Sequence, residues 1–236
     1  RIWAVDLLGR MRDLPRYKAT VWRNPVDVSV NELFYPGTAR PVWDPGGPGT
    51  PSHLRVPFAV FLEEIYPDVS AELASVLGVT GLFEELHRNN DAYEHHSLRD
   101  EWFHIGLVRY QRWYHQACEF FPRTCSLLAL RTEVSECPNV NALLIRLLPG
   151  RGLKPHFGNA PRLSAHLALS SSEGATMHVG PAAVTWTPGH AMVFDDTFRH
   201  SVKHLGSSPR YVLNVCFCHP CDTRHPQPSG YAPPCG

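Results

Sequence analysis

The sequence predicts a mainly β protein with flanking helices, built around a sandwich or a barrel. Three observations predict this fold class. After Cys137, short apolar stretches alternate with turns rich in Gly, Pro and Ser, which is typical of closely spaced strands. Helical spacing of apolar residues occurs before Cys137. The chain also carries 22 prolines among 236 residues, and proline disfavours long helices.

The composition is that of a folded chain, with 43% hydrophobic and 19% charged residues. The 22 basic and 22 acidic residues cancel, so charge gives no reason to expect a nucleic-acid partner. No run of 18 apolar residues is present, and we expect no membrane span. The sequence begins at Arg1 without Met and leaves targeting and oligomeric state open.

The elements before Cys137 follow from helical period and from proline and glycine. Residues 34–56 crowd prolines and glycines together and predict a loop. Apolar residues then recur at helical spacing, with Pro67 ending one helix and starting a second, which stops at Gly78. A further helix is expected over 81–88, and another over Pro122–Val134.

The strands are predicted from alternation. Phe103, Ile105 and Leu107 alternate with their neighbours after Glu101. The remaining predicted strands are Ala142–Leu148, Leu163–Leu169, Ala175–Val179, Ala191–Phe194 and Tyr211–Cys218. We divide the chain into an N-terminal segment packing on the domain (1–34), one domain (35–220) and a proline-rich tail, extended or disordered (221–236).

Three residues in the second half suggest a metal and anion site. His156 lies in the turn after one predicted strand, His200 lies in the loop after another, and Arg210 follows ten residues later. Two neutral imidazoles suit Fe(II), and a guanidinium can hold the distal carboxylate of 2-oxoglutarate with two parallel hydrogen bonds. The third ligand position of the usual iron triad is Gly158, which has no side chain. The alternative interpretation makes these a turn residue, a loop residue and a surface charge.

A wider set of residues resembles one oxygenase family. These residues are His156, Phe157, Gly158, Arg162, His166, Phe194, Asp195, Asp196, Phe198, His200, Arg210, His219 and Pro220. Together they resemble the aspartyl/asparaginyl β-hydroxylases, iron(II)/2-oxoglutarate oxygenases known for His-x-Gly at the metal. More loosely, the resemblance extends upstream to Trp102, Cys118, Pro122, Thr124, Cys125 and residues 39–44. It covers roughly residues 35–220.

The resemblance implies a double-stranded β-helix, or jelly-roll, and a set of residue roles. It makes His156 and His200 the iron ligands. It pairs Arg210 with the distal carboxylate of 2-oxoglutarate and places His166 near the other carboxylate. Asp196 matches an acidic residue close to metal-bound water.

The substrate side and the departures complete this set. Arg162 matches an arginine that can face the substrate, and Trp102 is expected in the core or lining the substrate pocket. Ser164 lies on the cosubstrate face of its strand, where the family's peptide hydroxylases have Arg, and Ile145 stands where they have Ser. Both departures weaken the cosubstrate pocket as inherited, although Arg210 remains its main anchor.

The seven cysteines leave the compartment open. Cys118 and Cys125 occupy positions that form a disulfide in animal members of the family, which implies a secretory or endoplasmic reticulum lumen location if they are bridged and a cytoplasmic one if not. Cys216, Cys218 and Cys221 cluster near His219, but their spacing is unlike standard zinc sites. The odd count leaves at least one free thiol.

Three functions remain open from the sequence. The first is hydroxylation of a C–H bond in a free amino acid, a peptide Asp or Asn residue or a small natural product, using Fe(II), 2-oxoglutarate and molecular oxygen. The second uses the same cofactors for cyclisation, desaturation or halogenation, because glycine at the carboxylate position leaves room for a halide. The third is a non-catalytic barrel that has lost cosubstrate binding at Ile145 and Ser164.

Overall fold

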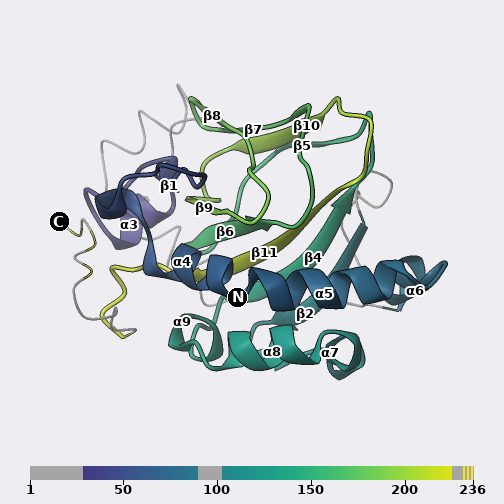
Figure 1. Ribbon diagram of the computed structural model, residues 1–236. Coiled ribbons are helices and arrows are strands. Elements are labelled where there is room, and N and C mark those ends of the chain that lie inside the picture. Colours follow the sequence, from purple (N-terminus) through teal and green to yellow (C-terminus); the bar gives the residue numbers. More distant parts are fainter. Residues whose placement is uncertain (1–28, 90–102, 225–230, 232, 234, 236) are drawn as a thin grey trace.

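The protein is a jelly-roll barrel of two antiparallel sheets with helices packed outside the larger one (Figure 1). The computed structural model describes residues 29–89, 103–224, 231, 233 and 235. The larger sheet has seven strands in the order β1-β9-β6-β11-β4-β2-β3, and the smaller has four in the order β5-β10-β7-β8. No helix in the described ranges is long and apolar enough to cross a bilayer.

The helical elements, in chain order, are α3 Asn31–Phe34, η1 Ser52–Leu54, α4 Pro57–Glu64, α5 Tyr66–Leu77, α6 Leu82–Arg88, α7 His115–Phe120, α8 Pro122–Ala129 and α9 Thr132–Ser135. The strands of the larger sheet are β1 Val42–Asp44, β2 Phe103–Arg109, β3 Arg112–Trp113, β4 Asn141–Leu147, β6 Arg162–Ala168, β9 Ala191–Phe194 and β11 Arg210–Cys218. Those of the smaller sheet are β5 Gly152–His156, β7 Ala175–Val179, β8 Ala182–Val184 and β10 His200–His204.

The larger sheet separates two apolar cores. On β11, Leu213, Val215 and Phe217 pack on the helix side, where Phe217 meets Phe58 of α4 with ring centroids 4.4 Å apart. Val212 points the other way into a second cluster between the sheets. Because strand side chains alternate, residues 210, 214 and 216 share the barrel-facing side with Val212.

Most predicted elements are confirmed. The strands at Ala175–Val179 and Ala191–Phe194 have the expected bounds, and the others differ by one residue. A single residue, Ile65, separates the end of α4 from the start of α5. Pro67 lies in the first turn of α5, and Gly78 caps its end. The segment that joins the two long helices is therefore short because proline starts the second one.

Two expectations about the first half of the chain are wrong in detail. Residues 34–56 are not all loop, since they contain β1 and η1. The helix expected over Pro122–Val134 is two helices, because α8 stops at Ala129. Leu130, which extended the apparent helical period, is 78% exposed and buries no apolar surface.

The smaller sheet is where the sequence was least informative. His156 ends strand β5 and His200 begins strand β10, so neither lies in a turn or loop. Pro155 argued against a strand, but β5 is an edge strand, where proline is tolerated. On β10 the buried residues are His200, Val202 and His204. Because two of these three are polar, the strand lacks the apolar–polar alternation by which strands are predicted.

The chain ends are tied to the domain where they are described. Ser29 and Val30 hydrogen-bond to Thr197, and Asn31 donates to the carbonyl of Arg162 over 2.8 Å. At the other end, Asp222 is buried and a disulfide joins Cys221 to Cys235. The division into segments 1–34, 35–220 and 221–236 stays a prediction, since residues 1–28 and much of the tail lie outside the described residues.

Candidate active site

A cavity of about 530 Å³ lies between the two sheets and collects most of the predicted site residues. Its lining includes His156, Gly158, Arg162, Ser164, His166, Asp196 and His200. It also includes Asn214 and Cys216 from β11 and Ile145 from β4. The strands of both sheets thus contribute to a single polar cavity inside the barrel.

The two histidines are held together by strand pairing. His156 and His200 are Cα partners across the antiparallel β5–β10 pair, and their ring centroids are 4.2 Å apart. The Nδ1 atom of His156 lies 2.7 Å from the carbonyl oxygen of Lys154, and that of His200 lies 2.9 Å from the carbonyl oxygen of Phe198. A carbonyl only accepts, so each Nδ1 carries the proton and each Nε2 keeps its lone pair for a metal.

Burial keeps His200 in the form that can bind a metal. Burial, and after it the neighbouring His156, lowers the pKa of His200 from 6.5 to about 4. The imidazole is therefore neutral near pH 7. No group of three or more His, Cys, Asp or Glu side chains poised for a metal occurs in the described part of the chain.

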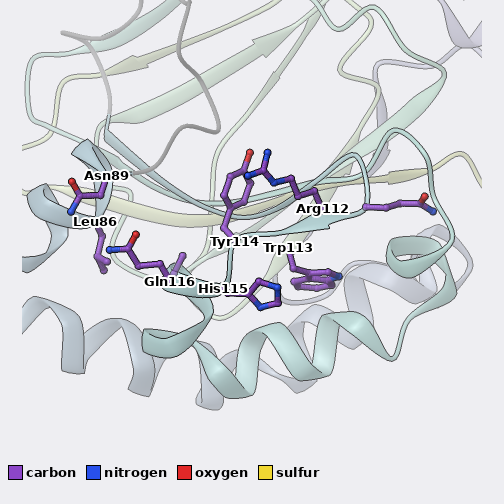
Figure 2. Close-up of a pocket in the computed structure, with 9 residues that line it drawn as sticks. Leu86, Asn89, Arg112, Trp113, Tyr114, His115 and Gln116 are labelled. Carbon is purple, nitrogen blue, oxygen red and sulfur yellow. The ribbon is translucent and has the colours of Figure 1, made fainter.

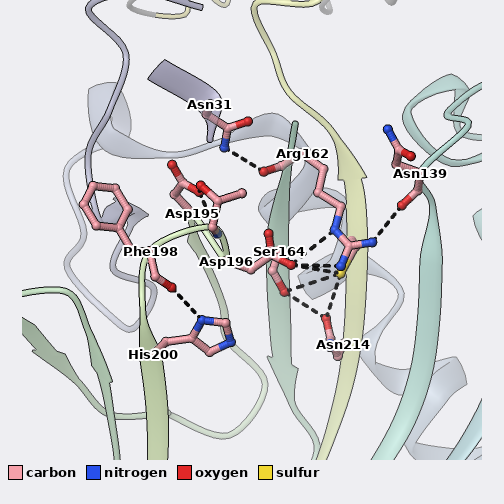
Figure 3. Close-up of polar contacts among 11 residues, drawn as sticks. Asn31, Asn139, Arg162, Ser164, Asp195, Asp196, Phe198, His200 and Asn214 are labelled. Carbon is pink, nitrogen blue, oxygen red and sulfur yellow. Dashed lines mark hydrogen bonds and ion pairs between the residues drawn. The ribbon is translucent and has the colours of Figure 1, made fainter. Parts of the chain in front are cut away.

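Asp196 occupies the space that a side chain at position 158 would need. A Cβ built on Gly158 would lie 2.7 Å from Oδ2 of Asp196, too close for a real contact. The Gly158 N–H also donates to the Asp196 carbonyl over 2.7 Å. Oδ2 accepts from Nε and Nη2 of Arg162 at 3.2 and 3.0 Å (Figure 3). Oδ1 is buried and has no hydrogen bond to any described residue, which leaves it open to a ligand beside the histidines.

Arg210 is a buried cation without a described counter-charge. It begins β11 on the barrel-facing side and is 2% exposed. Its guanidinium lies over the ring of Trp186, 3.5 Å from the centroid. Within the described chain, Nε and Nη2 are buried and make no hydrogen bond, and burial lowers the pKa of Arg210 from 12.5 to about 9. A buried, unpaired guanidinium is costly, so the position is suited to an anionic ligand.

His166 is held as a neutral hydrogen-bond donor. Nε1–H of Trp186 donates to Nδ1 of His166 over 3.3 Å, so the proton of His166 lies on Nε2. Burial, and after it the charge of Arg210, holds the pKa of His166 well below 6.5. The donor Nε2–H is therefore available to the cavity that His166 lines.

Comparison with known proteins agrees with this geometry. The sequence profile of the aspartyl/asparaginyl beta-hydroxylase family matches residues 63–220. The chain belongs to this family.

The chain matches only part of each similar protein. The chain is 35% identical over 125 residues to human aspartate beta-hydroxylase domain-containing protein 2, covering 51% of this chain and 34% of that protein. It is 32% identical over 131 residues to human aspartyl/asparaginyl beta-hydroxylase, covering 54% and 17%. It thus spans about a third or less of the length of these relatives.

Solved structures with a related fold are more distant. A viral collagen prolyl hydroxylase from Paramecium Bursaria Chlorella virus-1, in complex with 2OG, has a TM-score of 0.34 and 13% identity, covering 51% of this chain and 80% of that one. A predicted oxalate decarboxylase from Thermotoga maritima has a TM-score of 0.34 and 14% identity, covering 50% and 81%.

The structure places six of the eight predicted site residues around the barrel cavity, namely His156, Arg162, Ser164, His166, Asp196 and His200. Arg210 is buried on the barrel-facing side of β11 but is not among the residues that line this cavity, and Trp186 lies against it. Trp102 lies outside the described residues. Asn214 and Cys216 were missed as site residues, although the alternation that starts at Arg210 could have found them.

The cysteines form three disulfides among the described residues. The Cys118–Cys125 pairing implied by the family is confirmed. The last cluster, whose spacing is unlike standard zinc sites, is used in disulfides instead, because Cys218 pairs with Cys137 and Cys221 pairs with Cys235. Cys216 is free and buried, and burial raises its pKa to about 11, so it is a neutral thiol.

A second pocket, of about 600 Å³, lies outside the barrel beside α6, β3 and α7 (Figure 2). Its lining is Leu86, Asn89, Gln111, Arg112, Trp113, Tyr114, His115, Gln116 and Ala117. These described residues include one histidine and no carboxylate or cysteine.

Proposed function

We propose that this chain is an iron(II)- and 2-oxoglutarate-dependent oxygenase that hydroxylates an unactivated C–H bond. The observation that carries the proposal is the unpaired guanidinium of Arg210 in the same barrel as the paired histidines His156 and His200. The histidines suit Fe(II), and the buried cation suits one end of a dicarboxylate. When bound, iron and 2-oxoglutarate would supply the activation of oxygen.

The described residues take separate roles in this proposal. His156 and His200 would hold the iron through Nε2, with Nδ1 of each ring fixed by a backbone carbonyl. Arg210 would bind the distal carboxylate of 2-oxoglutarate, and His166 would donate to the other carboxylate. Asp196, held by Arg162, would accept a hydrogen bond on Oδ1 from a group beside the iron.

The position of Asp196 favours hydroxylation over halogenation. Gly158 had suggested room for a halide, but the carboxylate of Asp196 fills the space beside it. A negative carboxylate at that place disfavours a second anion. The non-catalytic alternative is also disfavoured, because a barrel without an anionic ligand would bury Arg210 with the ring of Trp186 but no described counter-charge to compensate it.

The substrate class follows from the family. The relatives named as aspartyl/asparaginyl beta-hydroxylases make an Asp or Asn residue of a peptide the first substrate to test. A free amino acid and a small natural product are the other two. All three would reach the iron through the barrel cavity, with Phe157 exposed at its rim.

The test is turnover with a defined product. The protein is supplied with Fe(II), ascorbate, 2-oxoglutarate and oxygen, together with Asp- or Asn-containing peptides, free amino acids or chloride. We expect succinate release and a product heavier by one oxygen atom, independent of chloride. A chloride-dependent product mass would support halogenation instead. No succinate with any substrate, and no binding of 2-oxoglutarate, would support the non-catalytic barrel.

We also propose that the chain matures in an oxidising compartment such as the lumen of the endoplasmic reticulum. The three disulfides support this, since thiols in the cytosol are kept reduced. The count of free thiols under non-reducing denaturation should be one, from Cys216. A count of seven would instead support a cytoplasmic location.

A further inference from the structure

The larger sheet presents a pair of neutral polar side chains to the cavity, Ser164 and Asn214, and the family resemblance assigns no role to Asn214. The Ser164 hydroxyl donates to Oδ1 of Asn214 over 2.9 Å, between strands β6 and β11 (Figure 3). The thiol of Cys216 also points at Oδ1, from 3.9 Å. Both contacts come from donors, so they fix the amide with its oxygen toward Ser164 and its Nδ2 hydrogens directed elsewhere.

The free side of this amide is open to the cavity. Asn214 lines the cavity and is half-buried, and Nδ2 makes no hydrogen bond to any residue in the described ranges. Asn214 is also the direct Cα partner of His166 across the β6–β11 pair. Side chains of such partners stand roughly 5 Å apart on the same face. The amide and the Nε2–H of His166 are therefore neighbouring neutral donors.

We propose that Asn214, oriented by Ser164, binds the metal-side carboxylate of 2-oxoglutarate together with His166. This inference rests on the proposed function and deepens it. It assigns to a neutral amide the role that the family resemblance gives to an arginine at position 164. A carboxylate accepts hydrogen bonds on both oxygens, and the two donors approach it from adjacent positions on one sheet face.

A neutral pair is also consistent with the charges nearby. Arg210 is already buried without a described counter-charge, and its charge lowers the pKa of His166. A second buried guanidinium at position 164 would add like charge to this interior. The family's peptide hydroxylases have a serine hydroxyl at the position of Ile145 on β4. Asn214, on the neighbouring strand β11, would supply a hydrogen-bond donor in its place.

The first experiment measures cosubstrate binding without turnover. Calorimetry with the Mn(II)-loaded protein compares 2-oxoglutarate with 2-oxopentanoate, which keeps the metal-side carboxylate and lacks the distal one. Asn214→Leu should raise the dissociation constant of both acids by about ten- to a hundredfold, because a hydrogen bond to a charged group is lost. Arg210→Ala should weaken 2-oxoglutarate and leave 2-oxopentanoate nearly unchanged.

A double-mutant cycle tests the orienting role of Ser164. Ser164→Ala should weaken binding by a smaller factor, and the double variant should bind no worse than Asn214→Leu alone, because both changes act through one amide. Asn89→Leu, the same substitution of an exposed residue outside the barrel, is the matched control and should change binding by less than about twofold. Circular dichroism on every variant checks folding.

The outcomes separate the inference from the proposed function. If the wild type binds 2-oxoglutarate and Asn214→Leu binds it with the same affinity, the role of Asn214 is overturned and the oxygenase proposal stands. An Asn214→Leu effect on 2-oxoglutarate but not on 2-oxopentanoate would place Asn214 at the distal carboxylate and also overturn the inference. Absence of binding by the wild type would overturn both.

Discussion

In the seven-stranded sheet every residue of β4 is buried, whereas in the four-stranded sheet β5 has no fully buried residue. The larger sheet is covered on both faces, by helices on one side and by the barrel interior on the other (Figure 1). The smaller sheet has one covered face and one exposed face. The sheets also divide the site, since the smaller supplies the histidine pair and the larger supplies Arg210 and His166.

This difference teaches where each part of the chemistry can be placed. Dry surroundings strengthen the attraction between a guanidinium and an anionic ligand, and the doubly covered sheet provides them around Arg210. A metal that exchanges ligands with solvent and substrate would need access, which the edge strand β5 would provide at His156. Substitutions in the two sheets should therefore have different consequences for binding and for stability.

The largest expected effect is the loss of metal binding from the smaller sheet. His156→Ala and His200→Ala should each abolish Fe(II) binding and turnover, because two ligands leave no redundancy. Metal titration by calorimetry measures binding, and thermal unfolding measures the fold, which should change little for the half-buried His156. Asp196→Ala should keep the metal. Equal metal loss in Asp196→Ala would place that carboxylate on the iron.

The next effect belongs to the larger sheet. Arg210→Ala should raise the apparent 2-oxoglutarate constant at least about a hundredfold, since losing one partner of a buried charge pair costs roughly 3–5 kcal/mol. Succinate release against 2-oxoglutarate concentration measures it. Arg210→Lys should recover only part of the affinity for 2-oxoglutarate, because an ammonium cannot form the two parallel hydrogen bonds that a guanidinium forms. Unchanged Fe(II) affinity in both variants is the control, and equal kinetics in all three proteins would remove Arg210 from the site.

The same division explains what the sequence could predict. Five strands of the larger sheet were found because their apolar runs are strong, as in Ala191–Phe194, where all four residues are buried, but the short β1 and β3 were not. In the smaller sheet only β7 was found. The strands β5 and β10 were missed because Pro155 and the inward-facing histidines obscure the pattern that burial normally leaves, and the three-residue β8 was missed as well.

For the site, the residue types and spacing made the histidines and Arg210 candidates, but they did not predict the contacts of these residues. Only the fold shows that Trp186 lies against Arg210 and donates to His166. The carboxylate of Asp196 beside Gly158 also depends on two distant segments meeting. Cross-strand partners such as Asn214 and His166 follow from register, which no local pattern specifies.

A matched pair of leucines tests the stability side of the comparison. Leu213 of β11 is fully buried on the helix side, and Leu153 of β5 is half-buried on the barrel side. Leu213→Ala should cost about 4 kcal/mol of unfolding free energy, within the usual range for a buried leucine. Leu153→Ala should cost about 1 kcal/mol. Urea unfolding with the disulfides intact measures both, and equal costs would contradict the different packing of the two sheets.

The smallest effect concerns pH and the far end of the larger sheet. His219, directly after β11, stacks on Tyr35 with centroids 4.2 Å apart and meets the ring of Trp43 edge-on. Burial lowers the pKa of His219 from 6.5 to about 3, with Arg40 acting in the same direction and Asp222 opposing it.

The folded state therefore binds fewer protons than the unfolded state between about pH 3 and 6.5, and stability falls as pH drops through this window. From pH 7 to pH 5 this histidine should account for a loss of about 2 kcal/mol. His219→Phe keeps an aromatic ring in the stack and removes the titrating group. Between pH 7 and pH 5 the unfolding free energy of this variant should therefore fall by about 2 kcal/mol less than that of the wild type. Parallel pH profiles for wild type and variant would mean that the ring of His219 takes up its proton without leaving the folded structure.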